Sequence, residues 1–330
     1  GNDYLDTRFP FQGRFMTDDN DRYIFGDFGT SNYTYNGISY LMLANKDITW
    51  EVARKHDIGI DFYLFGNKFS GTIDYFRETR DGIFMTRNYL PQIIGVSNSQ
   101  QPSANIGKVR STGVDGNIAY TEKIGQVNLT VRGNFTYSHS KILEYDEQYS
   151  HYAYSRNSGF RVDQARGLIA LGLFKDYDDI RYSPDQSALK GDFEIAPGDI
   201  KYKDVNGDGK INDNDIVPIG STTKPNLIYG FGISAQWKGF DFNVLFQGVG
   251  ESSFFINGFT VYPFSQGSWG NILTDVVGNY WSLGKNEDIH AKYPRLTYGN
   301  NSNNNRASTY WLRDGSYLRL KNLEIGYTLP

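Results

Sequence analysis

The chain has 330 residues, a formal net charge of −4 and lysines and arginines spread along its length, so its charge pattern predicts no nucleic-acid partner. It contains no cysteine, which excludes thiolate metal sites, cysteine nucleophiles and disulfide bonds. No apolar run approaches the ~18 residues of a membrane helix. Aromatic residues make up 16% of the chain and glycine supplies 36 residues, a composition typical of membrane β-barrels and of soluble all-β proteins that bind sugars.

The clearest predicted elements are antiparallel strands joined in hairpins. Their side chains alternate between apolar and polar with a period of two, and short turns such as Gly66-Asn67 and Lys238-Gly239 join neighbouring strands. We count about nine strands in all. The best defined are residues 51–64, 69–76, 114–120, 127–137, 227–237, 240–247 and 316–329.

The alternation assigns side chains to two faces of the predicted sheet. In a membrane barrel the apolar face meets lipid and the other face lines the lumen. We therefore expect lipid contact for Ile58, Ile60, Phe62 and Leu64. We expect a lumenal position for Gly59, Asp61, Gly230, Gly232 and Gln236.

The lengths of the connections favour a barrel over a soluble sandwich. Hairpin turns are tight, whereas residues 80–105, 144–225 and 250–313 form long connections between hairpins. A compact soluble domain rarely has several loops of this length, but outer-membrane barrels combine short periplasmic turns with long external loops. The prediction is an all-β, antiparallel transmembrane β-barrel segment with long extracellular loops.

One motif in the second long connection carries the pattern of a calcium-binding loop. Residues 204–215 place oxygen-bearing groups at the positions where a hard divalent cation is wrapped by a glycine-containing turn. The expected ligands of a structural Ca²⁺ are Asp204, Asn206, Asp208, Lys210 through its carbonyl, Asn212 and Asp215. The alternative is an Asx/Gly turn that binds nothing. A dockerin repeat is excluded, because Pro218 and Pro225 prevent the helix that would follow.

No pattern in the chain predicts an enzyme. The four histidines are scattered, and there is no Gly-x-Ser-x-Gly elbow, no phosphate-binding loop and no identifiable acid/base pair of carboxylates. Aromatic residues crowd the last long connection, where they predict either a stacking surface for sugars or peptides, or packing within the loop and against a partner. These residues are Phe254, Phe255, Tyr262, Phe264, Trp269, Tyr280 and Trp281.

Four segments, in order along the chain, resemble the SusC/RagA family of TonB-dependent outer-membrane transporters. The first runs from Asn45 to Glu51, with lysine at 46 where the family has proline, and it continues into the hairpin that contains Asp61 and Gly71. The others are Asn105-Ile-Gly-Lys-Val-Arg110-Ser-Thr-Gly113-Val, Gly198-Asp-Ile-Lys-Tyr202 with the glycine-rich turn that follows, and Leu312-Arg-Asp-Gly-Ser316 with the last strand.

This resemblance implies a function and a setting. A member of the family imports oligosaccharides or peptides across the bacterial outer membrane, driven by TonB, with a SusD-like surface lipoprotein that covers the barrel. The chain would be part of a 22-strand barrel, with the plug, the TonB box and the final strands outside residues 1–330. Residues 144–225 would form an external loop region that carries the turn at 204–215.

A different class of protein also fits the alternating pattern. A soluble, secreted, β-rich glycan-binding module with a calcium-stabilised loop would have the same strand period. It predicts a sheet that closes within the 330 residues, whereas the barrel segment predicts an open one.

Overall fold

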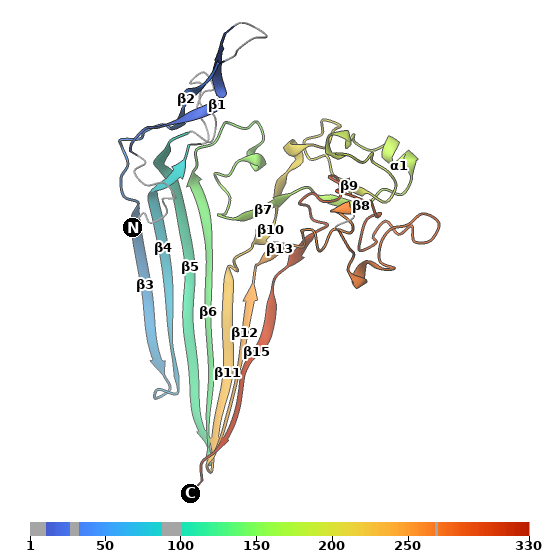
Figure 1. The fold of residues 1–330 in the computed structure, drawn as a ribbon. Helices are drawn as coiled ribbons and strands as arrows, with labels where there is room; N and C mark the ends of the chain where they lie inside the picture. The colour runs from blue at the N-terminus through green and yellow to red at the C-terminus, as the bar shows by residue number, and fades with distance from the viewer. Residues whose placement is uncertain (1–10, 27–32, 88–100, 268–269, 330) are drawn as a thin grey trace.

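A computed structural model describes residues 11–26, 33–87, 101–267 and 270–329. Its central element is one antiparallel sheet of seven strands in the order β15-β12-β11-β6-β5-β4-β3 (Figure 1). These strands are β3 (Val52–Leu64), β4 (Phe69–Thr86), β5 (Ser103–Ile124), β6 (Val127–Glu144), β11 (Leu227–Trp237), β12 (Phe240–Gly250) and β15 (Tyr317–Tyr327). The seven best defined of the predicted strands all lie in this sheet, and strands that follow one another in the list above are paired neighbours.

The tight turns lie at one end of the sheet and the long connections at the other, as the sequence predicts (Figure 1). Between β11 and β12, Lys238 and Gly239 both have positive φ, 46° and 86°, which suits the right-handed twist of a two-residue hairpin. Gly125 takes φ 62° in the turn between β5 and β6. The end with the turns therefore corresponds to the periplasmic side of a barrel.

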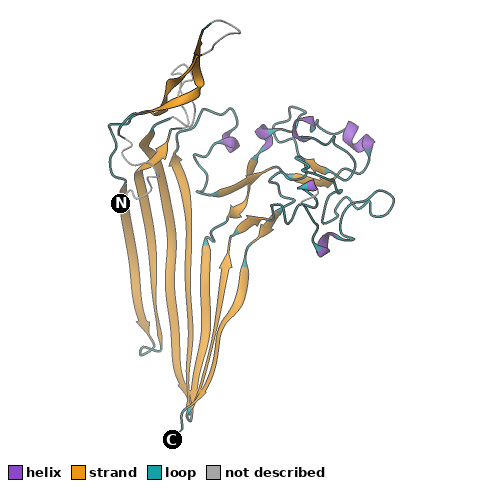
Figure 2. Cartoon of the chain, viewed as in Figure 1, coloured by secondary structure: helices purple, strands orange, loops and turns teal. Residues whose placement is uncertain are grey.

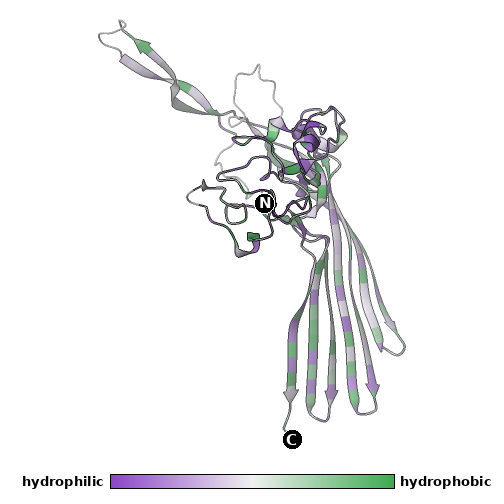
Figure 3. Ribbon diagram, turned by 90° about the vertical axis from the view of Figure 1, so that its right-hand side faces the viewer, coloured by the Kyte–Doolittle hydropathy of each residue, from purple (hydrophilic) through white to green (hydrophobic). Residues whose placement is uncertain are grey.

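The two faces of the sheet differ in polarity, as the alternation predicts. Strand pairing aligns Phe62, Gly71, Ile118 and Gly133 on one face. Asp61 aligns with Thr72, Asn117 and Asn134 on the opposite face, where the Thr72 hydroxyl donates to the Asp61 carboxylate over 2.6 Å. Figure 3 shows the resulting bands of hydrophobic and hydrophilic residues along the strands. Register places all the predicted lipid-facing residues on the first face and all the predicted lumenal residues on the second.

Several strands of the sheet are longer than the sequence predicts. The described residues contain fifteen strands, seven of them in this sheet, whereas the sequence predicts about nine. β5 has 22 residues, about twice the ~9–11 that a tilted strand needs to cross a bilayer. The first long connection was predicted at 80–105, but β4 continues to Thr86 and β5 begins at Ser103, so both ends of that range belong to strands. Residues 88–100 of this connection lie outside the described residues. A separate hairpin of β1 (Arg14–Phe25) and β2 (Tyr33–Met42) was not predicted.

Within the described residues the sheet does not close. Among the strands that the structure describes, β3 pairs only with β4 at one edge, and β15 pairs only with β12 at the other. The soluble alternative predicts a closed fold, and this sheet does not meet that expectation. The open arrangement is the one expected of a segment of a larger barrel.

The other two long connections pack together into a unit that we call the loop cap, residues 145–226 and 251–316. It contains all the described helical turns, the longest of which has five residues (Figure 2). Among the described residues, no helix is long and apolar enough to span a membrane. The cap elements are η3 (Ala153–Ser155), β7 (Gln164–Gly167), β8 (Ala170–Leu173), α1 (Tyr177–Arg181), η4 (Ser187–Leu189), β9 (Ile200–Tyr202), η5 (Asp213–Asp215), β10 (Val217–Thr222), β13 (Ser253–Phe255), η7 (Thr274–Val276) and β14 (Leu312–Asp314).

The loop cap holds the hydrophobic core of the described structure. Side chains from both connections meet there, and Ile200, Ile211 and Val276 are completely buried. Leu168 from residues 145–226 and Trp311 from residues 251–316 are also inside. The region predicted at 144–225 is therefore one half of a compact unit whose other half comes from residues 251–316.

Candidate functional site

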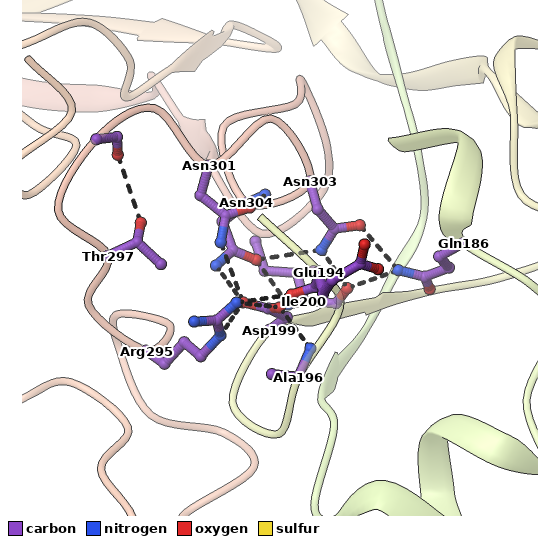
Figure 4. A network of polar contacts seen from close by, with 11 residues as sticks. Gln186, Glu194, Ala196, Asp199, Ile200, Arg295, Thr297, Asn301, Asn303 and Asn304 are labelled. Carbon is purple, nitrogen blue, oxygen red and sulfur yellow. Dashed lines mark hydrogen bonds and ion pairs between the residues drawn. The ribbon is translucent and has the colours of Figure 1, made fainter. Parts of the chain in front are cut away.

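A buried carboxylate lies at the centre of the loop cap. Asp199 precedes β9 and is completely buried. Its side chain accepts two hydrogen bonds from the Arg295 guanidinium, from Nε over 2.7 Å and from Nη2 over 3.0 Å (Figure 4). A two-pronged contact of this kind is the strongest geometry for an arginine–carboxylate pair.

Asparagine side chains complete the surroundings of this carboxylate. Asn304 Nδ2 donates to Asp199 Oδ1 over 2.8 Å, and Asn301 Nδ2 donates over 3.2 Å. The backbone N–H of Ala196 donates to Oδ2 over 2.9 Å. A buried charge is tolerated only when it is paired and hydrogen-bonded, and Asp199 meets that condition.

The same asparagine-rich segment also holds β9. Asn304 Oδ1 accepts from the Ile200 N–H over 2.9 Å, and Asn303 Nδ2 donates to the Ile200 carbonyl over 3.0 Å. Gln186 binds both Asn303 and the Tyr202 N–H. Segments about a hundred residues apart in the chain are thus joined by buried polar side chains (Figure 4). The clustered asparagines at 300–305 were the sequence signal for this network, which sequence reasoning missed.

The turn predicted to bind calcium lies on the surface of the cap. Asp204 accepts from the N–H groups of Gly207, over 2.7 Å, and Gly209, over 2.8 Å. Asp215 is completely buried and accepts from Val205, over 2.8 Å, and Asn212, over 2.9 Å. The first and last predicted ligands are therefore oriented by the turn itself.

The middle predicted ligands make local contacts of the same kind. Asn206 Oδ1 accepts from the Asp208 N–H, and Asp208 Oδ1 accepts from the Lys210 N–H over 2.8 Å. Asn212 caps η5, since its Oδ1 accepts from the Asn214 N–H over 2.8 Å. Each carboxylate or amide oxygen has two lone pairs, so these bonds leave acceptor capacity for a cation.

Two tyrosines from the same long connection, residues 144–225, cover the turn. Tyr154 donates to the Asn214 carbonyl over 2.8 Å, and Asn206 Nδ2 donates to the Tyr152 hydroxyl over 3.2 Å. Burial raises the pKa of Tyr154, and the neighbouring Tyr152 and the negative charges of Asp215, Asp204 and Asp208 raise it further. Three predicted ligands therefore lie within electrostatic reach of one hydroxyl.

The carboxylates alone do not form a metal centre. Among the described residues, no three histidine or acidic side chains gather closely enough to ligate one ion. A calcium shell here would depend on the oxygens of Asn206 and Asn212 and on the Lys210 carbonyl as well. This donor set, which contains only oxygen, is the one that calcium prefers.

Most aromatic residues of the last connection pack inside the cap. Trp281 is buried in the core, and Phe255, Tyr262 and Tyr280 pack against it. Phe254 is 44% exposed, and Trp269 lies outside the described residues. The interpretation as loop packing therefore holds for these four residues, and docking onto a partner stays a prediction.

A second polar cluster lies at the outer end of the sheet, and we call it the bulge latch. Asn105 Nδ2 donates to the carbonyls of Gly82, over 2.8 Å, and Thr49, over 2.9 Å. Asn105 Oδ1 accepts from the Thr49 N–H over 2.9 Å, and Glu51 accepts from the Phe84 N–H over 3.2 Å. Gly82 is a bulge residue with φ 67°. Two of the segments that carry the family resemblance thus meet around one irregularity of the ladder.

Comparison with known proteins identifies the architecture. Residues 12–330 match the family model described as TonB dependent receptor-like, beta-barrel. The chain is 28% identical over 307 residues to TonB-dependent receptor P3 of Formosa agariphila, covering 89% of the chain and 29% of that protein. It is 23% identical to TonB-dependent receptor SusC of Bacteroides thetaiotaomicron, covering 93% of the chain and 28% of that protein. The chain thus spans less than a third of the length of these relatives.

Solved structures show the same fold. The RagAB peptide transporter superposes with a TM-score of 0.64 at 18% identity, covering 97% of this chain and 32% of that one. The RagAB peptide importer in its open-open state gives a TM-score of 0.66, covering 98% and 32%. The resemblance to SusC and RagA is confirmed, and with it the outer-membrane location. With a two-faced antiparallel sheet, tight turns at one end and a family match over nearly its whole length, the chain belongs to the TonB-dependent receptor-like β-barrel family.

Proposed function

We propose that this chain is the wall and loop cap of a TonB-dependent importer that carries oligosaccharides or peptides across the outer membrane. The observation that supports this most directly is the sheet with one apolar and one polar face and a large, cored cap at the end opposite the turns. SusC among the curated relatives and the RagAB peptide importer among the solved structures agree with such a role. The role is transport, and no residue is assigned to catalysis.

The proposal includes three partners. TonB would supply the energy through a segment outside this chain, a SusD-like lipoprotein would cover the cap, and membrane lipid would contact the face that carries Ile58, Ile60 and Phe62. The two exposed edges, β3 and β15, would continue the sheet into the remaining strands of the barrel.

An uptake experiment tests this function. Cells that express the complete transporter should accumulate labelled oligosaccharides or peptides, and deletion of TonB should abolish the accumulation. Deletion of residues 252–315 in the complete protein should lower uptake while the barrel still assembles in the outer membrane. Uptake that persists without TonB would contradict the proposal.

We further propose that the turn at 204–215 binds a structural Ca²⁺. The oxygens of Asp204, Asp208 and Asp215 are held by the turn's own N–H groups, and the asparagine oxygens and the Lys210 carbonyl would complete the shell. The turn joins parts of the cap, because Asp185 pairs with it at Gly209 and Ile211, and Arg306 contacts Asp213 over 3.0 Å. The ion would fasten the cap and take no part in transport chemistry.

Calorimetric titration of the complete transporter with calcium tests the second proposal. Asp208→Ala removes one predicted ligand from an exposed position and should weaken binding at least ~10-fold, equivalent to ~1.4 kcal/mol. Asp192→Ala, exposed elsewhere in the cap, serves as the matched control. Equal affinity of the wild type and Asp208→Ala would exclude Asp208 as a ligand, and absence of binding in the wild type would refute the site.

A further inference from the structure

An apolar pocket interrupts the polar face of the sheet near the loop cap. It has a volume of about 350 Å³ and lies over β4, β5 and β6. Its apolar lining is Ile83, Met85, Gly107, Val109, Ile142, Tyr145 and Val162. Farther from the cap, the same face of the strands carries the polar residues Asp61, Thr72 and Asn117. The apolar patch therefore departs from the polar character of this face.

The pocket exists because the ladder is irregular. In a regular β4, the side chains at even positions such as Thr72 and Arg80 share the polar face. The register shift between Asp81 and Ile83 reverses this order, so that Ile83 and Met85 point to the polar face instead. The bulge latch, through Asn105 and Glu51, holds this shift in place.

Gly107 lets the floor of the pocket form. A Cβ atom at this position would lie 3.1 Å from both Ile83 Cβ and Met85 Sδ. Glycine therefore lets β5 pass close beneath these two side chains, which a larger residue would displace by a few tenths of an ångström. The irregular strand, the latch and this glycine together build a recess rather than a flat surface.

The charges around the pocket are already paired with one another. Glu78 contacts Arg80 over 2.9 Å and Lys55 over 3.3 Å. Lys108 contacts Asp81 over 2.8 Å. The charged border therefore has no strong preference for a charged ligand, and the apolar floor determines what binds.

We propose that this pocket binds an apolar side chain of a peptide cargo. The inference rests on the proposed import function and selects peptides over oligosaccharides for this subsite. Sugar hydroxyls would lose their hydrogen bonds to water above a floor of aliphatic side chains, whereas an aliphatic side chain gains free energy by burial there. The volume lies at the lower end of the ~300–1,000 Å³ typical of ligand sites, which suits one or two side chains of a longer ligand.

Binding measurements on the complete transporter test the pocket. The probes are a pair of short alanine peptides that differ only in a central leucine or serine, and a malto-oligosaccharide of similar length. We expect the leucine peptide to bind about 10-fold more tightly than the serine peptide, equivalent to ~1.4 kcal/mol. Equal affinity of the two peptides, or tighter binding of the sugar, would overturn the inference.

Val162→Trp fills the pocket from an exposed loop position and should remove the preference for leucine. Val277→Trp makes the same change at an exposed position of the cap outside the pocket, and should leave the preference intact. The shift in mobility on unheated gel electrophoresis reports whether each variant has a folded barrel. A folded Val162→Trp variant that keeps the preference would overturn the inference.

Uptake by cells that express the complete transporter separates this inference from the proposed function. If the wild type takes up no peptide and no sugar in a TonB-dependent manner, the import function itself fails. If uptake depends on TonB but is the same for the leucine and serine peptides, only the pocket is wrong.

Discussion

Replacement of Asp199 by alanine should unfold part of the loop cap while leaving the sheet intact. The substitution removes the only carboxylate that the described structure pairs with Arg295, and it leaves the amides of Asn301 and Asn304 without their acceptor. Removal of one partner from a buried ion pair costs about 3–5 kcal/mol. We take the lower end, about 3 kcal/mol, because 21% of the Arg295 side chain is exposed and water can solvate part of its charge.

Hydrogen exchange followed by mass spectrometry measures this effect locally. A loss of about 3 kcal/mol corresponds to exchange about 10²-fold faster, and the increase should appear in residues 198–205 and 300–311, which the network joins. The peptides of β5 and β6 should exchange at wild-type rates, since they lie outside the cap core. Asp192→Ala, an exposed substitution in the same connection, is the control. An increase below about threefold in both cap segments, or one of equal size in the sheet, would refute this reasoning.

Two further predictions concern the latch and the acid stability of the cap. Asn105→Ala deletes three hydrogen bonds of the bulge latch and should destabilise the barrel by about 1–3 kcal/mol. The folded band on an unheated gel should then be lost at a lower temperature than in the wild type, whereas the control Asn117→Ala, on the same strand, should keep the wild-type temperature. Identical temperatures for Asn105→Ala and the wild type would contradict this prediction. The hydrogen bond from Lys292 holds the pKa of Asp275 below its usual 3.8. The ionised carboxylate therefore stabilises the folded cap at pH values above 3.8, and this stabilisation is lost as the pH falls through the lowered pKa. Urea unfolding followed by tryptophan fluorescence should therefore show the wild type to be more stable than Asp275→Asn near neutral pH but equally stable in strong acid. A difference in stability that does not change with pH would count against this prediction.

Much of the fold follows from local sequence. The period-two alternation from Ile58 to Leu64 sets the two faces of a strand, because successive side chains point to opposite sides of the backbone. Lys238-Gly239 sets a hairpin, because its two residues adopt the positive φ that the twist of the strands requires. These are properties of neighbouring residues, so the two faces of the strands, the hairpins and the end that carries the tight turns could be predicted without coordinates.

The loop cap and the pocket could not be predicted in this way. Asp199 and Arg295 are almost a hundred residues apart, and nothing in either segment indicates that they meet. The turn at 204–215 was recognised because its oxygens are close in sequence, but its fastening to Asp185 and Arg306 depends on chain packing. The register shift at Gly82 reverses the faces of β4, which no alternation rule can anticipate.

The sequence by itself determined the sheet, the orientation of its faces and the family, because these depend on contacts between neighbouring residues and neighbouring strands. Only the tertiary structure decided that two long connections share one core and that an apolar pocket opens on a polar wall. Both depend on contacts between segments that are distant in the chain. Such contacts leave no periodic signal, since the free energy of burying a side chain does not depend on how far away in sequence its partner lies.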